Sequence, residues 1–466
     1  MKKYDYDIVI IGAGGAGITA SFTGNGFKKK VLLVEKNKIG GECTHSGCVP
    51  SKALIKAAKL TYNVTTLKDY SIDLKYKLNT ENVMDYVKSI VNKVYEEEKP
   101  HSFEERGISV LKGHASFINS NTISVNGENI TGKNFIIATG TSPKLPPIKG
   151  IDSDYILTNE TIFNLEKLPK SMGVIGAGAI GIELAQALNR LGVSVDILLR
   201  GDRILKKEEK ETSKRIEDIL LGEGIEIHKN VKLKKIEDGT IHYLDNGNMG
   251  YFSSFEKILV ATGRKPNLDN MNLKKIGVDY DSNKIIVNDK LQTSVSNIYA
   301  AGDIAGPYRF SHMAEYQGFI AAFNCIFPVK KKTDYSQVLW TTFTDPEISH
   351  IGYTEEEAHK KYDNIKVYTE TYSHLDRAIT DNEQGFVKVI CHKDNIVGAH
   401  IIGNRAGELI HEIQMLKKFN IPIKKTADMI YAYPTYSDII RKIGKKAYLD
   451  YLNNNLIVKT IKNISK

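Results

Sequence analysis

Two glycine-rich loops with the same spacing constrain the fold of this chain more than any other feature. The first loop follows the apolar run Asp7–Ile11, and the second follows Gly173–Ile175. Each loop precedes a segment of helical character and then another apolar run, at Val31–Val34 and Val193–Leu198. A strand, glycine loop, helix and strand in this order form the βαβ unit that binds a dinucleotide. The sequence therefore predicts two dinucleotide-binding α/β domains.

The first loop has the spacing G-x-G-x-x-G at Gly12, Gly14 and Gly17. The first glycine permits a tight turn, the second lets the backbone approach a pyrophosphate, and the third lets the helix pack on the strand. The helix N-terminus then supplies N–H donors and the positive end of a dipole. Glu35 ends the following strand, where a carboxylate can bind the ribose hydroxyl groups. These residues predict one dinucleotide site.

The second loop repeats the spacing at Gly176, Gly178 and Gly181. Glu35 follows its third glycine by 18 residues, and the residue 18 beyond Gly181 is the apolar Leu199. The acid that favours NADH is therefore missing. Arg200 comes next and Lys206 follows, and a guanidinium can make paired hydrogen bonds to the 2′-phosphate of NADPH. The sequence predicts NADPH, with an exposed loop role for Arg200 as the alternative.

Composition excludes several classes of protein. A chain of 466 residues, 41% of them apolar, is too long for one core. The net charge of +9 comes mostly from lysines scattered among acids, without a long basic arm, so we expect no nucleic-acid partner. No run of 18 apolar residues exists, so we expect no membrane span. Asp5 and Asp7 interrupt any signal-peptide pattern. We predict a cytoplasmic protein with a small-molecule partner.

The four cysteines are too few for a disulfide scaffold in so long a chain. Cys325 and Cys391 stand alone in apolar surroundings, and we expect both to be buried packing residues. Cys43 and Cys48 form a close pair, which in a reducing cytosol is catalytic instead of structural. The sequence predicts no metal-ligating residues.

The segment around the cysteine pair resembles a known family. It reads Gly40-Gly-Glu-Cys-Thr-His-Ser-Gly-Cys-Val-Pro-Ser-Lys52, and it is similar to the signature G-G-x-C-x-x-x-x-G-C-x-P-x-K of the class I pyridine nucleotide-disulfide oxidoreductases. These include dihydrolipoyl dehydrogenase, glutathione reductase and mercuric reductase. Three further segments look like family landmarks in family order: Ala261–Asn267, Ala301–Asp303 and Phe343–Ile348. The resemblance spans nearly the whole chain and implies FAD, a nicotinamide cofactor and a homodimer.

The resemblance also implies a domain organisation. The expected fold is α/β, with two Rossmann-like dinucleotide-binding domains and a C-terminal α+β dimerisation domain. The FAD-binding domain is expected at 1–148 and 264–333, the NAD(P)H-binding domain at 149–263, and the dimerisation domain at 334–466. Inside the first domain, apolar periodicity over about Glu81–Glu105 predicts a helix.

The residues around the cysteines have expected roles. Pro50 suits the first turn of a helix, so Cys48 would lie at a helix N-terminus, where the dipole and unpaired N–H groups favour a thiolate. By resemblance, Cys48 faces the flavin as its charge-transfer partner, while Cys43 exchanges with the substrate. Lys52 follows Cys48 by four residues, and its family counterpart lies near the flavin and pairs with a glutamate, here Glu183.

Further cofactor contacts are expected where strands run into glycines. By resemblance, Asp303 binds the ribityl chain of FAD. The predicted cofactor-binding residues at the other strand ends are Ala138, Thr139, Gly140 and Gly263.

The chain departs from disulfide reductases near its C-terminus. The family carries His-Pro-Thr-x-x-Glu there, acting across a dimer interface, whereas this chain has Tyr433-Pro-Thr-Tyr-Ser-Asp438. A phenol with a pKa near 10 is a poor base at neutral pH, and losing a general acid–base costs about 10²–10⁴ in rate. Tyr433 and Asp438 are nevertheless the candidate catalytic residues here. Mercuric reductases resemble this chain in carrying tyrosine in that region, although this chain lacks their C-terminal cysteine pair.

His45 lies between the two cysteines and could act as a local acid–base. A solvent-facing loop histidine is the favoured interpretation.

Three functions remain open. The leading one is an NADPH-dependent FAD oxidoreductase whose dithiol reduces a soft metal ion, a reactive disulfide or another small acceptor. The second is a dihydrolipoyl dehydrogenase that uses NAD. The third, from another class, is a flavin-bound redox sensor without turnover.

Overall fold

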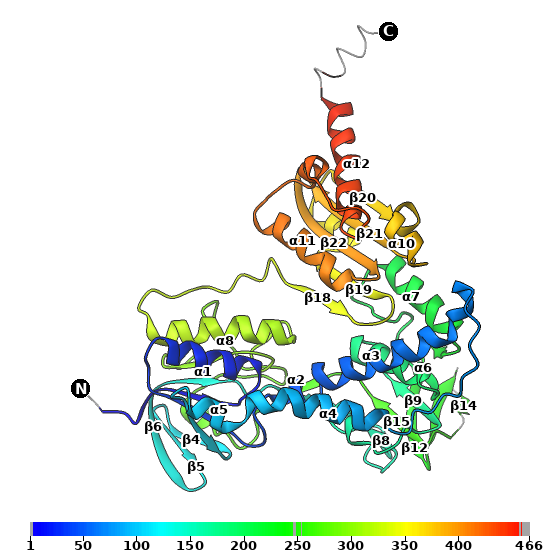
Figure 1. Cartoon of the computed structure of the whole chain (residues 1–466). Coiled ribbons are helices and arrows are strands. Elements are labelled where there is room, and N and C mark those ends of the chain that lie inside the picture. The colour runs from blue at the N-terminus through cyan, green and yellow to red at the C-terminus, as the bar shows by residue number, and fades with distance from the viewer. Residues whose placement is uncertain (1–2, 246–247, 253, 456–457, 459–466) are drawn as a thin grey trace. The chain divides into compact units, whose positions relative to one another are not determined.

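The computed structural model of the chain describes residues 3–245, 248–252, 254–455 and 458, and it divides into two compact units. Unit 1 comprises residues 1–176, 187–198 and 231–334, and unit 2 comprises residues 177–186, 199–230 and 335–466. Each unit is described by itself (Figure 1). The three-domain division expected from the sequence stays a prediction.

The first sheet of unit 1 is built around a parallel core. Its strands lie in the order β3 (Ser109–Lys112), β2 (Val31–Glu35), β1 (Tyr6–Ile11), β6 (Glu128–Ile137), β5 (Thr122–Val125) and β4 (Ala115–Asn119), and β17 (Ile298–Ala300) also pairs with β6. The β1, β2, β3, β6 and β17 pairings are parallel, whereas β4, β5 and β6 pair antiparallel.

The continuous apolar run of β1 follows from burial on both faces of this sheet. Ile8 and Ile10 join one buried cluster, and Val9 and Ile11 join another. Parallel strands covered on both faces have this composition. Helices α1 (Gly15–Gly26) and α8 (Ser311–Ile326) pack side by side over this sheet (Figure 1).

Unit 1 contains a second parallel sheet with a similar strand–helix–strand unit. It contains β10 (Ser194–Leu198), β9 (Ser171–Ile175), β15 (Lys257–Val260) and β8 (Ile156–Leu157) in that order. Helix α6 (Ala179–Arg190) connects β9 to β10. Smaller antiparallel elements complete the unit: β12 (Lys232–Glu237), β13 (Thr240–Asp245) and β14 (Asn248–Tyr251) form one sheet, and β7 (Thr141–Pro143) pairs with β16 (Arg264–Pro266). Both predicted βαβ units are therefore present.

The helical segment of the first domain is interrupted. Helices α2 (Gly41–His45) and α3 (Cys48–Thr65) precede it. The helix predicted over Glu81–Glu105 is wrong as a single element, because α4 (Val83–Tyr95) gives way to a short 3₁₀ turn and then to α5 (Pro100–Glu104). Lys99 has extended backbone angles, as expected for a residue that precedes proline. The periodicity identified the helices but not the break between them.

Residues 335–466 of unit 2 combine helices with an antiparallel sheet, which is the α+β character expected for this part of the chain. Its antiparallel sheet has the order β18 (Leu339–Thr342), β19 (Glu347–Gly352), β22 (Asn395–Gly403), β21 (Phe386–His392) and β20 (Ile365–Thr371). Helices α11 (Ala406–Lys418) and α12 (Asp438–Asn454) share one apolar cluster with this sheet. The remaining elements are α7 (Lys210–Gly222), β11 (Glu226–His228), α9 (Glu355–Lys361) and α10 (Asp376–Thr380).

Among the residues that the structure describes, no helix combines the length and the apolar character that crossing a membrane requires.

Candidate dithiol and dinucleotide site

The first glycine loop has the backbone geometry that its spacing predicts. Gly12 has a φ of +102°, and a Cβ added there would lie 2.4 Å from the carbonyl oxygen of Ala138. A Cβ added at Gly17 would lie 1.9 Å from the carbonyl oxygen of Gly12. A Cβ at Gly14 would meet no atom within 4 Å. The loop is therefore packed on its inner side, and its backbone at Gly14 faces open space just before α1.

Glu35, the acid predicted at the end of β2, is hydrogen-bonded to the backbone of this loop. One carboxylate oxygen of Glu35 accepts a hydrogen bond from the backbone N–H of Ala13 at 2.8 Å, and the other accepts from Asn37 at 2.7 Å. Open space before a helix N-terminus, with a fixed carboxylate at the next strand end, suits the pyrophosphate and ribose of a dinucleotide. The residues present fit FAD.

The other predicted FAD contacts lie at neighbouring strand ends. The backbone N–H of Ala138 donates to Ile11 at 2.7 Å. The Thr139 hydroxyl donates to the backbone of Asn267 at 2.8 Å, and Gly140 has a φ of +67°. Asp303 follows β17 and accepts a hydrogen bond from the Thr141 hydroxyl at 3.0 Å. Unit 1 thus brings these residues together with the first glycine loop.

The cysteine segment begins directly on the glycine loop. The N–H of Gly40 donates to the carbonyl of Ala13 at 2.9 Å, and a Cβ added at Gly41 would lie 2.8 Å from the Cα of Gly14. Cys48 is the first residue of α3, as the sequence predicts, and its thiol is exposed. The Cys48 sulfur lies 3.1 Å from the hydroxyl of Ser311, the first residue of α8.

The two thiols are unequal. Hydrogen bonding with Cys48, burial, and the negative charge of Cys48 all raise the pKa of Cys43. Both cysteines are free thiols in this structure. Cys43 therefore keeps its proton while Cys48, at the N-terminus of α3, is the thiol placed to carry negative charge.

A buried polar network adjoins the cysteines. Arg264 forms an ion pair with Glu42 and donates through Nε to the Thr141 hydroxyl at 2.7 Å. The Asn159 amide donates to Glu42 at 2.7 Å. Burial raises the pKa of Glu42 to about 7 against the opposing charge of Arg264, while the nearby Asp303 adds to the rise. Burial also raises the pKa of Asp303. Glu42 is thus a titratable group beside Cys43 that changes charge near neutral pH.

Sequence reasoning missed four members of this site, namely Glu42, Asn159, Arg264 and Ser311. Glu42 occupies a position of the cysteine signature at which any residue is allowed. Arg264 belongs to the family segment Ala261–Asn267, but the sequence assigned it no role. Ser311 lies 263 positions from Cys48, and nothing in the local pattern signals that proximity. The available signal was the small residue Gly318, where a Cβ would lie 2.3 Å from the carbonyl of Ala16, which lets α8 pack closely on α1.

The second glycine loop has similar features. Gly176 has a φ of +115°, and a Cβ there would lie 2.5 Å from the carbonyl oxygen of Ala261. A Cβ at Gly178 would meet nothing within 4 Å, and Gly181 is buried in α6. Gly263 follows β15 with a φ of +145°. The loop therefore fits a second dinucleotide.

The residues after β10 differ in exposure. Leu199 is buried, whereas Arg200 and Lys206 are exposed. The Lys206 backbone carbonyl accepts a hydrogen bond from Arg203 at 2.7 Å. Two exposed cations therefore follow the strand that carries no terminal acid.

One predicted pairing, that of Lys52 with Glu183, is not brought together within one unit. Lys52 belongs to unit 1 and Glu183 to unit 2, so their pairing stays a prediction. Glu183 is buried and accepts a hydrogen bond from the backbone N–H of Phe343 at 2.8 Å.

Tyr433 and Asp438 both lie in unit 2 and have different partners. The Tyr433 hydroxyl donates to Asp376 at 2.8 Å, and its side chain is exposed. This hydrogen bond raises the pKa of Tyr433 above its ordinary value. Asp438 accepts a hydrogen bond from Arg441 at 2.6 Å. Less of this phenol is therefore ionised near neutral pH than in a free tyrosine.

The expectation of a solvent-facing loop histidine is wrong for His45. His45 ends helix α2 and is half-buried, with its ring 5.0 Å from that of Tyr95. Its Nε2 donates to the carbonyl of Ile39 at 2.7 Å. The sequence could not show this because the helix and both contacts depend on the fold around it.

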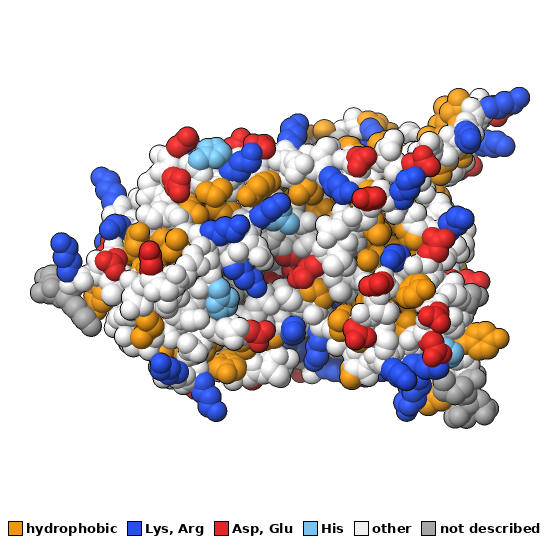
Figure 2. All heavy atoms as spheres, turned by 90° about the horizontal axis from the view of Figure 1, so that it is seen from below, with side chains coloured by type: hydrophobic (Ala, Val, Ile, Leu, Met, Phe, Trp, Pro, Cys, Tyr) orange, Lys and Arg blue, Asp and Glu red, His pale blue; other side chains and the backbone are white. Residues whose placement is uncertain are grey.

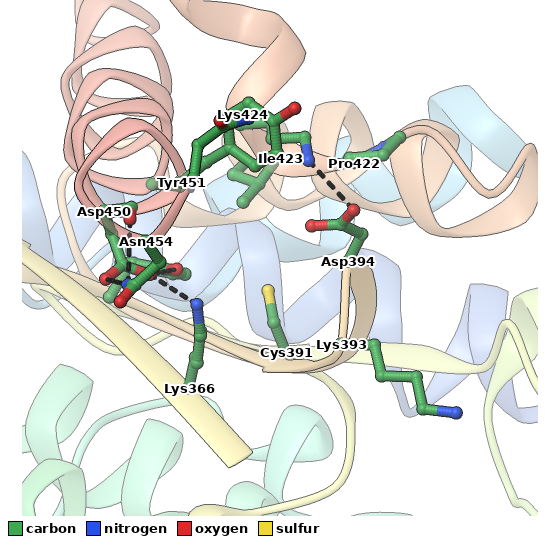
Figure 3. A pocket seen from close by; sticks show the side chains of 13 residues that line it. Lys366, Cys391, Lys393, Asp394, Pro422, Ile423, Lys424, Asp450, Tyr451 and Asn454 are labelled. Atoms are coloured by element: carbon green, nitrogen blue, oxygen red, sulfur yellow. Dashed lines mark hydrogen bonds and ion pairs between the residues drawn. The ribbon is translucent and has the colours of Figure 1, made fainter. Parts of the chain in front are cut away.

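Of the other two cysteines, Cys391 is buried as expected, whereas Cys325 is only half-buried, and each packs in an apolar cluster. Cys391 lines a pocket in unit 2, and Figure 3 shows its sulfur between Lys366 and Asp394. Ion pairs of Lys366 with Asp450 at 2.6 Å and of Lys424 with Asp394 at 2.9 Å border this pocket. Burial raises the pKa of Cys391 to about 12 and raises that of Cys325 as well. A thiol that stays protonated is a poor nucleophile, so neither is a redox partner.

Comparison with known proteins agrees with this geometry. Residues 6–318 match the family described as pyridine nucleotide-disulphide oxidoreductase, and residues 338–443 match its dimerisation domain. A mercuric reductase of Lysinibacillus sphaericus is 32% identical over 94% of this chain and 82% of the relative. A dihydrolipoyl dehydrogenase of Bacillus subtilis is 31% identical over 94% of this chain and 96% of the relative.

The solved structure of the HOCl-induced flavoprotein disulfide reductase RclA from Escherichia coli is also similar. It superposes with a TM-score of 0.85 at 26% identity, covering 94% of this chain and 99% of that protein. A Cu(II) complex of a cysteine-to-serine mutant of RclA superposes with a TM-score of 0.84 at 26% identity, covering 95% and 99%.

Two glycine loops and a thiol pair on an α/β framework define an NAD(P)H-dependent flavoprotein oxidoreductase. The chain belongs to the pyridine nucleotide-disulphide oxidoreductase family.

Proposed function

We propose that this protein transfers electrons from NADPH through FAD to the Cys43–Cys48 pair, and from there to a soft metal ion or another small acceptor that needs no strong base. The observation that carries the proposal is the combination of two unequal, adjacent thiols with Tyr433, a weak base. Bound FAD would supply the two-electron relay between the nicotinamide and the cysteine disulfide. Thiolates bind soft cations directly, so metal reduction does not depend on a proton shuttle.

The electron balance is simple for a two-electron acceptor. NADPH and one proton reduce the Cys43–Cys48 disulfide to two thiols and yield NADP⁺. The two thiols then give two electrons to Hg²⁺, which yields Hg⁰, the disulfide and two protons. Relatives named mercuric reductase and the Cu(II) complex of an RclA mutant support a metal acceptor.

The acceptor can be identified with a panel of substrates. Anaerobic NADPH oxidation by the FAD-loaded protein would be followed with Hg²⁺, Cu²⁺, lipoamide, glutathione disulfide and a quinone. We expect Cys43→Ser to lower metal-dependent turnover at least a hundredfold, because the acceptor loses one of its two thiolates. Cys391→Ser is the matched control, since that thiol is buried, and it should leave turnover unchanged. Metal-dependent turnover that survives Cys43→Ser would refute the dithiol route.

Arg200 is proposed to select NADPH over NADH. A charged hydrogen bond contributes about 1.5–3 kcal/mol, and tenfold in affinity corresponds to about 1.4 kcal/mol. Arg200→Glu should therefore lower kcat/KM for NADPH by about 10–100-fold and leave NADH less affected. Lys275→Glu changes the charge equally at another exposed position and should change neither value. An unchanged NADPH preference in Arg200→Glu would remove the assignment.

The second candidate function is a dihydrolipoyl dehydrogenase that uses NAD. The dihydrolipoyl dehydrogenase relative, which matches over almost its whole length, favours it. This function predicts faster turnover with NADH than with NADPH, and lipoamide as the best acceptor in the same panel. The raised pKa of Tyr433 argues against it.

A homodimer is proposed from the match to the dimerisation domain. Unit 2 exposes large apolar side chains over a limited stretch of sequence, which are Met415, Phe419, Met429 and Ile430. Exposed apolar patches mark interaction surfaces. Ile430→Asp should shift the mass measured by light scattering from dimer to monomer, whereas Val329→Asp, which is 79% exposed in unit 1, should not. A monomeric parent protein would refute the proposal.

The acceptor is proposed to be small. On the face shown in Figure 2, positive and negative side chains are interspersed, so the net charge of +9 is not gathered into one band there. Nucleic-acid binding draws on clustered cations. This distribution supports a small-molecule acceptor.

A further inference from the structure

Unit 2 contains a buried group of metal-ligating side chains outside the redox site. Glu208, His350 and His400 are 4%, 2% and 1% exposed, and their ligand atoms all lie within 4.8 Å of one another. Charged and titratable side chains are seldom buried unless they are paired or coordinate a metal. This cluster therefore requires a physical explanation.

The sheet register brings the two histidines together. In the antiparallel pair β19–β22, His350 lies directly opposite His400, and the two rings meet edge to face with centroids 4.1 Å apart. Both side chains lie on the face of the sheet opposite Ile351 and Ile401, which join the cluster packed with α11 and α12. Glu208 reaches the pair from the segment before α7.

In a neutral His350, the ring nitrogen that faces the carboxylate of Glu208 carries no hydrogen to donate to it. The Nε2 of His350 lies 2.8 Å from the carbonyl oxygen of Gly352, so Nε2 carries a hydrogen and donates it. In the neutral ring, Nδ1 is then a bare acceptor. This atom lies 3.1 Å from the Oε2 of Glu208, which is also an acceptor. Two acceptors at this distance require either an extra proton or a cation between them.

His400 presents a second bare acceptor. Its Nε2 lies 3.0 Å from the carbonyl oxygen of Tyr353 and donates to it. Its Nδ1 is buried and has no hydrogen-bond partner among the described residues. An unsatisfied buried acceptor costs about 1–3 kcal/mol, which a bound cation would recover.

The outer contacts of all three residues match those of metal ligands. Each histidine donates its other ring nitrogen to a backbone carbonyl, which fixes the tautomer and the ring orientation, as is usual for metal-bound histidine. The second carboxylate oxygen of Glu208 accepts a hydrogen bond from the Trp340 indole at 2.6 Å. The donors that remain are two imidazole nitrogens and one carboxylate oxygen.

The neighbouring charges leave the cluster able to accept a cation. Lys388 lies opposite His400 in the register of β21 and β22. Its ammonium group is already paired with Glu355 at 3.0 Å and Glu211 at 3.2 Å. Glu209, whose carboxylate lies 3.6 Å from the Nε2 of His400, adds another negative charge.

We propose that Glu208, His350 and His400 form a binding site for a divalent first-row transition cation, with Zn²⁺ as the representative ion. Two imidazoles and a carboxylate suit such ions. With bonds of about 2.0–2.2 Å to a tetrahedral ion, the Nδ1 of His350 and the Oε2 of Glu208, now 3.1 Å apart, would move slightly apart to accommodate the metal. The ion would join the segment before α7 to strands β19 and β22, so its role is structural and separate from electron transfer.

The test measures zinc bound to the FAD-loaded protein in its air-oxidised form, in which the Cys43–Cys48 disulfide does not compete for metal. After chelation and removal of the chelator, the protein would be incubated with Zn²⁺, desalted and analysed by inductively coupled plasma mass spectrometry. We expect one zinc per chain and a higher unfolding temperature with zinc than without it. Glu208→Gln and His400→Gln should each weaken zinc binding at least tenfold and abolish the thermal shift.

The controls distinguish this site from other sources of zinc binding. His228→Ala removes a half-buried histidine 3.5 Å from Glu226 and should leave the stoichiometry at one. Because His400→Gln could disturb folding, flavin content and circular dichroism are measured in parallel, and Glu208→Gln keeps an acceptor for Trp340. The proposal is overturned if the parent protein binds no zinc, or if binding is lost in Cys43→Ser or His228→Ala but kept in Glu208→Gln. An extra proton on His350 would then explain the contact with Glu208.

Discussion

The first glycine loop allows folding and cofactor binding to be perturbed separately. Gly14 and Gly17 belong to one motif, yet an added methyl group meets different surroundings at each. At Gly17 the new Cβ would lie 1.9 Å from the carbonyl oxygen of Gly12, about 1.5 Å inside the ordinary contact limit of 3.4 Å. At Gly14 it would meet no atom of the protein within 4 Å, and φ is −83°, which alanine adopts without strain. Gly17→Ala is therefore a folding mutation and Gly14→Ala a binding mutation.

The magnitudes follow from these distances. Relieving the Gly17 overlap requires α1 or the loop to shift, and overpacking of this kind costs about 1–3 kcal/mol or more. Gly14→Ala changes stability by about 1 kcal/mol at most, because reduced freedom of the unfolded chain offsets a poorer helix cap. In the FAD-bound protein, however, the methyl group occupies the approach of the pyrophosphate. Losing one charged hydrogen bond, about 1.5–3 kcal/mol, would weaken FAD binding about 10–100-fold.

The assay compares the two variants with the parent protein in apo form and with added FAD. Urea unfolding of the apoproteins followed by circular dichroism gives the free energy of unfolding, and flavin fluorescence quenching gives the Kd for FAD. We expect Gly17→Ala to lose stability already without FAD, and Gly14→Ala to lose only affinity. If Gly14→Ala binds FAD as the parent does, the pyrophosphate does not approach this loop, and the proposed cofactor site is wrong.

Three further predictions concern the replacement of the family's His and Glu by Tyr433 and Asp438, the pH dependence of stability, and the apolar core of unit 2. Replacing Tyr433 and Asp438 together by His and Glu should raise lipoamide-dependent turnover, by up to about 10²–10⁴ if the base is restored, and no gain would show that the tyrosine is not the limiting feature. Because burial raises the folded-state pKa of Glu42 to about 7 from 4.5, the stability supplied by its protonated form is present below about pH 4.5 and is lost as the pH rises through 7. In urea unfolding, the free energy of unfolding of Glu42→Gln should therefore rise by about 1–2 kcal/mol relative to that of the parent between about pH 5 and about pH 8. If the free energy of unfolding changes equally with pH in both proteins, the pKa of Glu42 is not raised. Ile440→Ala, fully buried between α12 and the sheet of unit 2, should cost about 2–5 kcal/mol, whereas Leu449→Ala at an exposed position should cost far less, as thermal unfolding would show.

Local chemistry explains why so much of the framework could be predicted from the sequence. Gly12 and Gly176 need positive φ values, and both have them. Cys48 is the first residue of helix α3, and Gly47 and Pro50 suit the start of that helix. Motifs of this kind encode backbone geometry within a few residues, so their structure does not depend on distant parts of the chain. The break before Pro100 was missed although the apolar positions stop at Tyr95 and the four residues 96–99 that follow are all charged.

Contacts between distant segments account for what the sequence could not show. Ser311 reaches Cys48 only because α8 packs on α1, and Arg264 reaches Glu42 only because β16 pairs with β7. The pKa of Glu42 depends on that burial, which no single-residue pattern contains.

The sequence by itself determined that this protein has two glycine-rich loops after parallel strands and a close cysteine pair at the start of a helix, because each depends on residues close together in the chain. Only the tertiary structure decided which groups surround the thiols, and that His350 and His400 share a buried face with Glu208. Strand register and helix packing set those distances, and both are properties of the whole fold.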